Sequence, residues 1–169
     1  MSTAMDMRSL MLLLEDVTEK YADGVYCSAR PTQSTIDALK SFCAAYDIPN
    51  PISGSEMHTT IIYSTQGNPD FTCIPEYETE IKAKFSGFDM FGKDKDTLVV
   101  KMKSPELQKR HKSMMKEFDL VYDFDEYIPH ITLSYDAAGF DISKLDDYHG
   151  DLMFSGEDEN ELEKDWKPE

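Results

Sequence analysis

Two histidines in this chain each precede a threonine by two residues: His58 with Thr60, and His130 with Thr132. Both motifs lie in runs of β-branched and apolar residues, which predicts a β-strand for each. Side chains two residues apart on a strand point to the same face, so each strand would present an imidazole beside a hydroxyl. Two such strands side by side would supply an acid, a base and two hydroxyl donors. These groups are what cleavage of a phosphodiester without a metal ion requires.

The elements that position the two motifs repeat in the same order. Residues 24–31 predict a strand, and Thr32 predicts the N-cap of a helix over 33–46 that precedes the first motif. Residues 96–103 again predict a strand, and Ser104 predicts the N-cap of a helix that precedes the second motif. Each cap lies 26 residues before the histidine of its motif. We therefore expect two lobes related by a pseudo-two-fold axis, with the histidine strands adjacent at the centre.

The remaining segments flank these repeats. Apolar residues spaced at threes and fours predict an amphipathic helix over 4–20. Alternation over 79–91 predicts an edge strand or hairpin, and 151–155 predicts a last short strand. We expect a single α+β domain of antiparallel sheet with flanking helices, divided into a helical N-terminal extension (1–22), a bilobal core (23–156) and an acidic, mobile tail (157–169).

The charge of the chain argues against some partners. Its 169 residues carry a net charge of −16, and residues 118–169 hold 16 acidic and 3 basic residues. Binding to long RNA or DNA depends on lysines and arginines that neutralise phosphates, so a polynucleotide partner is not expected. A small phosphorylated ligand in an enclosed pocket is compatible with this charge.

No cofactor is predicted from the residue types. Cys27, Cys43 and Cys73 lack metal-ligand spacing and have apolar or aromatic neighbours, which favours buried free thiols in a reducing cytoplasm. Neither histidine motif alternates with the Asp, Glu or Cys that would complete a metal site. The apolar run at 10–14 is too short to span a membrane. We therefore expect a cytoplasmic protein without a metal or a membrane segment.

Paired His-x-Thr motifs of this spacing resemble the signature of the two-histidine (2H) phosphoesterase superfamily, and the resemblance extends over residues 24–155. A narrower resemblance is to the phage anti-CBASS nuclease family, whose members disarm a bacterial immune system by cutting its cyclic di- and trinucleotide messengers. The segments that carry it are Tyr-Ala-Asp-Gly-Val-Tyr at 21–26, Ile-Pro-Asn at 48–50, Met-His-Thr-Thr-Ile-Ile-Tyr-Ser at 57–64, Lys-Arg-His at 109–111, Tyr-Ile-Pro-His-Ile-Thr-Leu-Ser-Tyr-Asp at 127–136, Asp-Ile-Ser-Lys-Leu at 141–145 and Asp-Trp at 165–166.

The resemblance implies a bilobal two-histidine fold and a metal-independent phosphodiesterase that cuts 3′-5′ bonds of cyclic oligonucleotides such as cyclic GMP-AMP. One histidine would remove the proton of the neighbouring 2′-hydroxyl and the other would protonate the departing 5′-oxygen, giving a 2′,3′-cyclic phosphate. Thr60 and Thr132 would stabilise the charge on the non-bridging oxygens. The sequence leaves open which of His58 and His130 is the base.

The resemblance also implies substrate contacts outside the two motifs. Tyr26, on the strand expected beside the catalytic pair, would contact the nucleotide. Trp166 would stack on a base, and Glu157 or Glu161 would orient a base edge. His111, beside two basic residues, is expected to be a solvated helix residue.

Three other functions stay open at this point. The chain could act on 2′,3′-cyclic or 2′-5′ linkages of RNA ends. It could be a sponge that binds a cyclic nucleotide without cutting it, although a sponge has no use for a matched acid and base. It could also be an adaptor that works through its acidic tail. Base preference, ring size and oligomeric state are not determined by the sequence.

Overall fold

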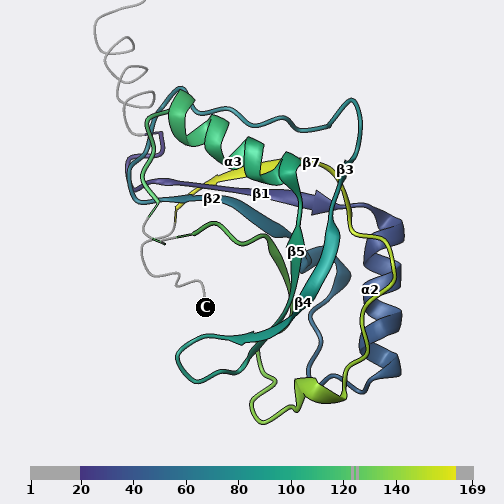
Figure 1. The fold of residues 1–169 in the computed structure, drawn as a ribbon. Helices are drawn as coiled ribbons and strands as arrows, with labels where there is room; N and C mark the ends of the chain where they lie inside the picture. Colours follow the sequence, from purple (N-terminus) through teal and green to yellow (C-terminus); the bar gives the residue numbers. More distant parts are fainter. Residues whose placement is uncertain (1–19, 123, 125, 163–169) are drawn as a thin grey trace, which may run out of the picture.

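A seven-stranded antiparallel sheet is the framework of the computed structural model, which describes residues 20–122, 124 and 126–162. The strand order is β3-β7-β1-β2-β6-β5-β4, so β2 and β6, which carry the two motifs, are neighbours at the centre (Figure 1). The predicted α+β class and the predicted adjacency of the histidine strands are therefore confirmed. The strands are β1 Val25–Pro31, β2 Thr59–Ser64, β3 Ile81–Lys82, β4 Lys84–Phe91, β5 Thr97–Lys103, β6 His130–Ser134 and β7 Met153–Glu161.

The sheet is curled so that its two edges approach each other. β3 and β4 are separated in the chain only by Ala83, yet β3 pairs with β7 at one edge and β4 pairs with β5 at the other. The alternating run over 79–91 therefore forms edge strands, as predicted, but it serves both edges of the same sheet (Figure 1). This arrangement shortens the unpaired backbone that an open sheet would leave at its ends.

Two capped helices lie outside the curl (Figure 1). They are α2, Gln33–Ala45, and α3, Pro105–Glu117. The hydroxyls of Thr32 and Ser104 each accept a hydrogen bond at 3.3 Å from the backbone N–H three residues further on, so both predicted N-caps are confirmed. α3 packs against β2, which connects the helix of the second repeat to the histidine strand of the first.

The core fills the space between the helices and the outer face of the sheet. Alternate residues of β1, namely Val25, Cys27 and Ala29, are fully buried on this face. Phe42 of α2 stacks on Phe88 of β4 with ring centroids 5.4 Å apart. The other face of the central strands is left to line the inside of the curl.

The last strand is longer than predicted and includes the start of the predicted acidic tail. β7 extends from Met153 to Glu161 and pairs with β1 from Val25↔Glu161 to Pro31↔Phe154. Residues 157–161 therefore belong to the sheet and not to an acidic tail, because the backbone hydrogen bonds of β1 and a buried ion pair described below hold them there. The predicted helix over 4–20 lies outside the described residues apart from Lys20, which is in a turn, and so does the predicted tail from 163.

No helix within the described ranges is long and apolar enough to cross a lipid bilayer.

Candidate active site

The antiparallel pairing of β2 with β6 brings the two histidine motifs together. Thr59 and Ile131, the middle residues of the motifs, are Cα partners in an antiparallel pair, so each histidine lies across from the threonine of the other motif. One face of the sheet therefore carries the four residues that flank this pair: His58, Thr60, His130 and Thr132. Directly opposed side chains have Cβ atoms about 4.5–5.5 Å apart, and diagonal neighbours, here the two histidines, are roughly 7–8 Å apart. The space between the imidazoles suits one phosphate group flanked by two hydroxyls.

Both histidines are oriented by the same type of hydrogen bond. His58 Nδ1 lies 2.6 Å from the carbonyl oxygen of Glu56, and His130 Nδ1 lies 2.9 Å from that of Ile128. A carbonyl oxygen only accepts, so Nδ1 carries a proton in both rings. In the neutral imidazole the lone pair is then on Nε2, which is the atom that exchanges a proton with a ligand.

The surroundings of His130 favour its neutral form. Burial lowers the pKa of His130 from its ordinary value of 6.5, and the nearby His58 lowers it further, while the hydrogen bond to Ile128 acts in the opposite direction. The edge of Phe91 contributes to this apolar environment, with ring centroids 4.9 Å apart. At neutral pH, His130 Nε2 is therefore available to accept a proton.

Tyr26 contacts both residues of the first motif. Its hydroxyl lies 2.8 Å from Thr60 Oγ1, and its ring meets the His58 ring edge-on with centroids 6.2 Å apart. Burial raises the pKa of Tyr26 to about 12, so the phenol keeps its proton at physiological pH. When Tyr26 donates to Thr60, the threonine hydroxyl can direct its own proton toward a ligand.

A cavity of about 930 Å³ opens beside His58 and extends over β1 and β7. This volume lies in the range of pockets that bind small molecules and cofactors. Tyr26 and Glu161, both predicted to contact a ligand, are in its lining, as is the partly exposed ring of Tyr135. The cavity is thus continuous with the first histidine motif.

Glu157 lies on the opposite face of the sheet from the histidines, which corrects the expectation that it orients a base edge. It is 1% exposed, and its carboxylate accepts two hydrogen bonds from the Arg110 guanidinium at 2.8 Å. The Tyr77 hydroxyl donates at 2.6 Å and the Ile74 backbone N–H at 2.8 Å. Alternation along β7 places the next residue, Asp158, on the face of the cavity instead. Trp166 lies outside the described residues.

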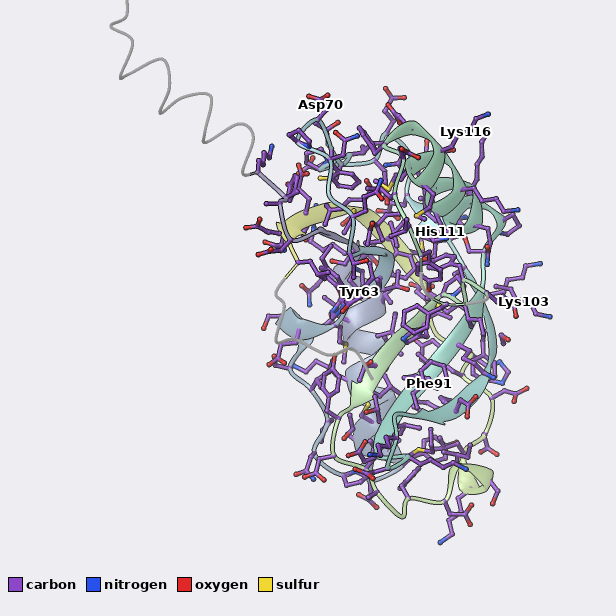
Figure 2. All side chains as sticks on the ribbon, turned by 90° about the vertical axis from the view of Figure 1, so that its left-hand side faces the viewer. Tyr63, Asp70, Phe91, Lys103, His111 and Lys116 are labelled. Carbon is purple, nitrogen blue, oxygen red and sulfur yellow. The ribbon has the colours of Figure 1, made fainter. Side chains whose placement is uncertain are left out.

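Two aromatic side chains hold the backbone of β2 from outside the cavity. His111 is 8% exposed and not solvated as expected, because α3 packs it against the sheet (Figure 2). Its Nδ1 lies 2.7 Å from the Ile61 carbonyl oxygen, and the Tyr127 hydroxyl donates to the Thr60 carbonyl at 2.8 Å. The two rings stack with centroids 4.3 Å apart and an angle of 7°.

These contacts compensate for the divergence of the two central strands. Within the described residues, β2 and β6 share one Cα pair, and the register shift between β1 and β2 leaves Ile61 without a partner on β1. The carbonyl oxygens of Thr60 and Ile61 are therefore paired with donors from elsewhere. His111 and Tyr127 provide them and thereby fix the backbone that carries Thr60. The one signal in the sequence that points to these two residues is the family resemblance, because both lie in segments that carry it.

The cysteines and acidic residues do not form a metal site in the part of the chain that the structure describes. No group of three His, Cys, Asp or Glu residues is placed to hold an ion there. Cys27, Cys43 and Cys73 are free thiols, the first two buried and the third half-buried.

Sequence comparison with known proteins identifies the family of this chain. The chain belongs to the anti-CBASS protein Acb1 family, whose model matches residues 23–169. That range contains all seven strands and both motifs, so the resemblance to the phage family is confirmed.

Three phage proteins show how far the similarity extends. The anti-CBASS protein Acb1 of Enterobacteria phage T4 is 29% identical over 146 residues, which are 86% of this chain and 93% of the relative. That of Escherichia phage RB16 is 32% identical over 145 residues, 84% of this chain and 82% of the relative. That of Salmonella phage S16 is 30% identical over 120 residues, 71% of this chain and 77% of the relative.

Proposed function

We propose that this protein is a metal-independent phosphodiesterase that opens cyclic oligonucleotide messengers in the host cytoplasm and so counteracts CBASS defence. The observation that carries the proposal is the crossed pair of motifs: two histidines with the same protonated Nδ1, each across from the other's threonine. The cavity beside His58 is large enough for a small nucleotide ligand. The name of the relatives supplies the biological setting.

In this proposal the chain has a bilobal two-histidine fold. One lobe is built from β1, α2 and β2, and the other from β5, α3 and β6. The matched helix caps and the symmetrical placement of β1 and β5 outside the central pair support this division.

The reaction begins with His130 as the general base. Its Nε2 takes the proton of the 2′-hydroxyl beside a 3′-5′ phosphodiester, and the 2′-oxygen attacks phosphorus. The bond from phosphorus to the 5′-oxygen breaks, and His58, as the imidazolium, donates its Nε2 proton to that oxygen. The ring is thereby opened to a linear product that ends in a 2′,3′-cyclic phosphate. Water then opens the cyclic phosphate to a 3′-phosphate with the two histidine roles exchanged, which restores both protonation states.

The threonine hydroxyls stabilise the negative charge that develops on the phosphoryl oxygens. Thr60 and Thr132, each across from the other motif's histidine, donate to the non-bridging oxygens, where preorganised donors lower the barrier most. Tyr26 orients Thr60 through their 2.8 Å contact and borders the nucleotide. Glu161, at the cavity, and Trp166 remain the candidates for contacts with a base.

The test is an incubation of the purified protein, with EDTA present, with 3′,3′-cyclic GMP-AMP, its 2′-deoxy analogue and 2′,3′-cyclic AMP. We expect a linear, phosphate-terminated product from the ribose ring, none from the deoxy ring, and loss of cleavage in His58→Ala and His130→Ala. Opening of the mononucleotide alone would assign the protein to RNA-end metabolism. Tight binding of the ring without cleavage would make it a sponge.

A further inference from the structure

Each histidine has a cationic neighbour on the strand outside it. The pairing of β1 with β2, continued by one residue past Ala29↔Thr59, places Arg30 across from His58. In the second half of the sheet, Lys101 of β5 is the Cα partner of His130. Residues paired in this way share a face, so the pseudo-symmetry extends beyond the His-x-Thr motifs to one cation on each flank.

The two cations also have matched carboxylates on the next strand outward. Arg30 Nη1 lies 2.9 Å from Asp158 Oδ1 on β7, and Lys101 Nζ lies 3.3 Å from Asp89 Oδ2 on β4. Both pairs are partly exposed, so each cation remains accessible to a ligand and its ion pair contributes little to stability.

The cavity distinguishes the two flanks. Arg30 is in its lining, whereas Lys101 and Asp89 are not. Among the described residues of that lining, Arg30 is the one permanent cation, because the other charged residues, Glu56, Asp158, Glu159 and Glu161, are all acidic. A polyanionic ligand in this cavity therefore depends on Arg30 for its charge compensation.

The guanidinium of Arg30 is preorganised for such a ligand. Two of its five N–H groups are engaged within the described residues, one by Asp158 and one by the Pro75 carbonyl at 2.6 Å. These contacts fix the plane of the fork, and three donors remain. Arginine in a fixed orientation recognises phosphate through paired hydrogen bonds that lysine cannot make.

We infer that Arg30 binds the phosphodiester of the ring that is not being cut. The inference rests on the proposed function: a cyclic dinucleotide carries two phosphates, and one of them occupies the space between the histidines. The remainder of the ring then extends over β1 and β7, where the cavity lies and where Arg30 faces it. Arg30 thereby selects ligands with a second phosphate over those with one.

Calorimetric binding in the His130→Ala background, which cannot cut the ring, tests this inference. The probes are 3′,3′-cyclic GMP-AMP, with two phosphates, and 2′,3′-cyclic AMP, with one. We expect Arg30→Gln to raise the Kd of the ring about 10- to 100-fold, the effect of one charge-assisted contact, and to change the Kd of the mononucleotide less than about twofold. An equal loss for both probes, or no loss for the ring, would overturn the inference.

Lys101→Gln is the matched control, because it removes the same charge from the corresponding place on the other flank. It is expected to change the two Kd values in equal proportion.

Asp158→Asn breaks the ion pair but keeps the guanidinium, so ring affinity should be unchanged or tighter. A loss as large as that of Arg30→Gln would show that the ion pair, and not phosphate binding, is responsible. If the wild-type protein binds the ring in an Arg30-dependent way but never cuts it, the proposed hydrolysis fails and this subsite stands.

Discussion

Replacing Glu157 with alanine should destabilise the protein strongly although the residue lies outside the cavity. Its buried carboxylate accepts four hydrogen bonds, two of them from Arg110, whose side chain is only 22% exposed. Alanine would leave these donors unpaired and the guanidinium without a counter-charge. Removing one partner of a buried ion pair costs about 3–5 kcal/mol of unfolding free energy. In a domain of this size that corresponds to a decrease in Tm of about 6–20 °C.

The next residue of the same strand provides the control. Asp158 also pairs with an arginine, but the side chains of Arg30 and Asp158 are 39% and 58% exposed, and exposed pairs contribute about 0–1 kcal/mol. Urea denaturation followed by circular dichroism should therefore show a loss below about 1 kcal/mol for Asp158→Ala. Equal losses for Asp158→Ala and Glu157→Ala, at equal m-values, would refute the reasoning.

A double variant separates the buried charge from the lost contacts. Arg110→Leu in the Glu157→Ala background removes the unpaired guanidinium and fills part of the space with apolar atoms. We expect the double variant to be more stable than Glu157→Ala alone, because the uncompensated charge is the larger part of the cost. A double variant that is less stable by the sum of the two single losses would contradict this account.

His58→Ala and His130→Ala should each reduce ring opening at least about 100-fold in the chromatographic assay, and full activity in either would exclude the paired acid and base. The lowered pKa of His130 should place the acid limb of kcat/KM below pH 6.5. Since the His130 imidazole binds a proton more readily in the unfolded chain, its contribution to stability is lost as pH falls below 6.5. An NMR titration that gives a raised pKa for His130 would refute both the pH profile of kcat/KM and this loss of stability. Tyr127→Phe should remove the donor to the Thr60 carbonyl and lower the unfolding free energy by about 1–3 kcal/mol, with a lower kcat, and stability unchanged in urea would show that the bond does not hold β2. Tyr26→Phe should lower kcat while keeping the Tm within a few degrees, because Thr60 then loses its orienting donor, and unchanged kcat would count against that role.

The parts of the fold that the sequence predicted are those with local signals. Thr32 and Ser104 are N-caps whose hydrogen bonds span three residues, and the alternation of the strands is visible within a few positions. The acidic composition of 157–161 predicts a tail where the structure has a strand, because composition does not show that Glu157 meets an arginine 47 residues away. The prediction that His111 is solvated is wrong for the same reason: its neighbours in sequence are basic, whereas its neighbours in space are the aromatic ring of Tyr127 and the backbone of β2.

The sequence by itself determined which groups can react and which share a face within each strand, since alternation along a strand is fixed by covalent geometry. Only the tertiary structure decided how the two strands meet. The pairing of Thr59 with Ile131 places each histidine across from the other motif's threonine, and a slip of one residue would turn one motif to the opposite face. Register, helix docking and the cation beside each histidine all depend on contacts between segments far apart in the chain, so no local pattern of residues could specify them.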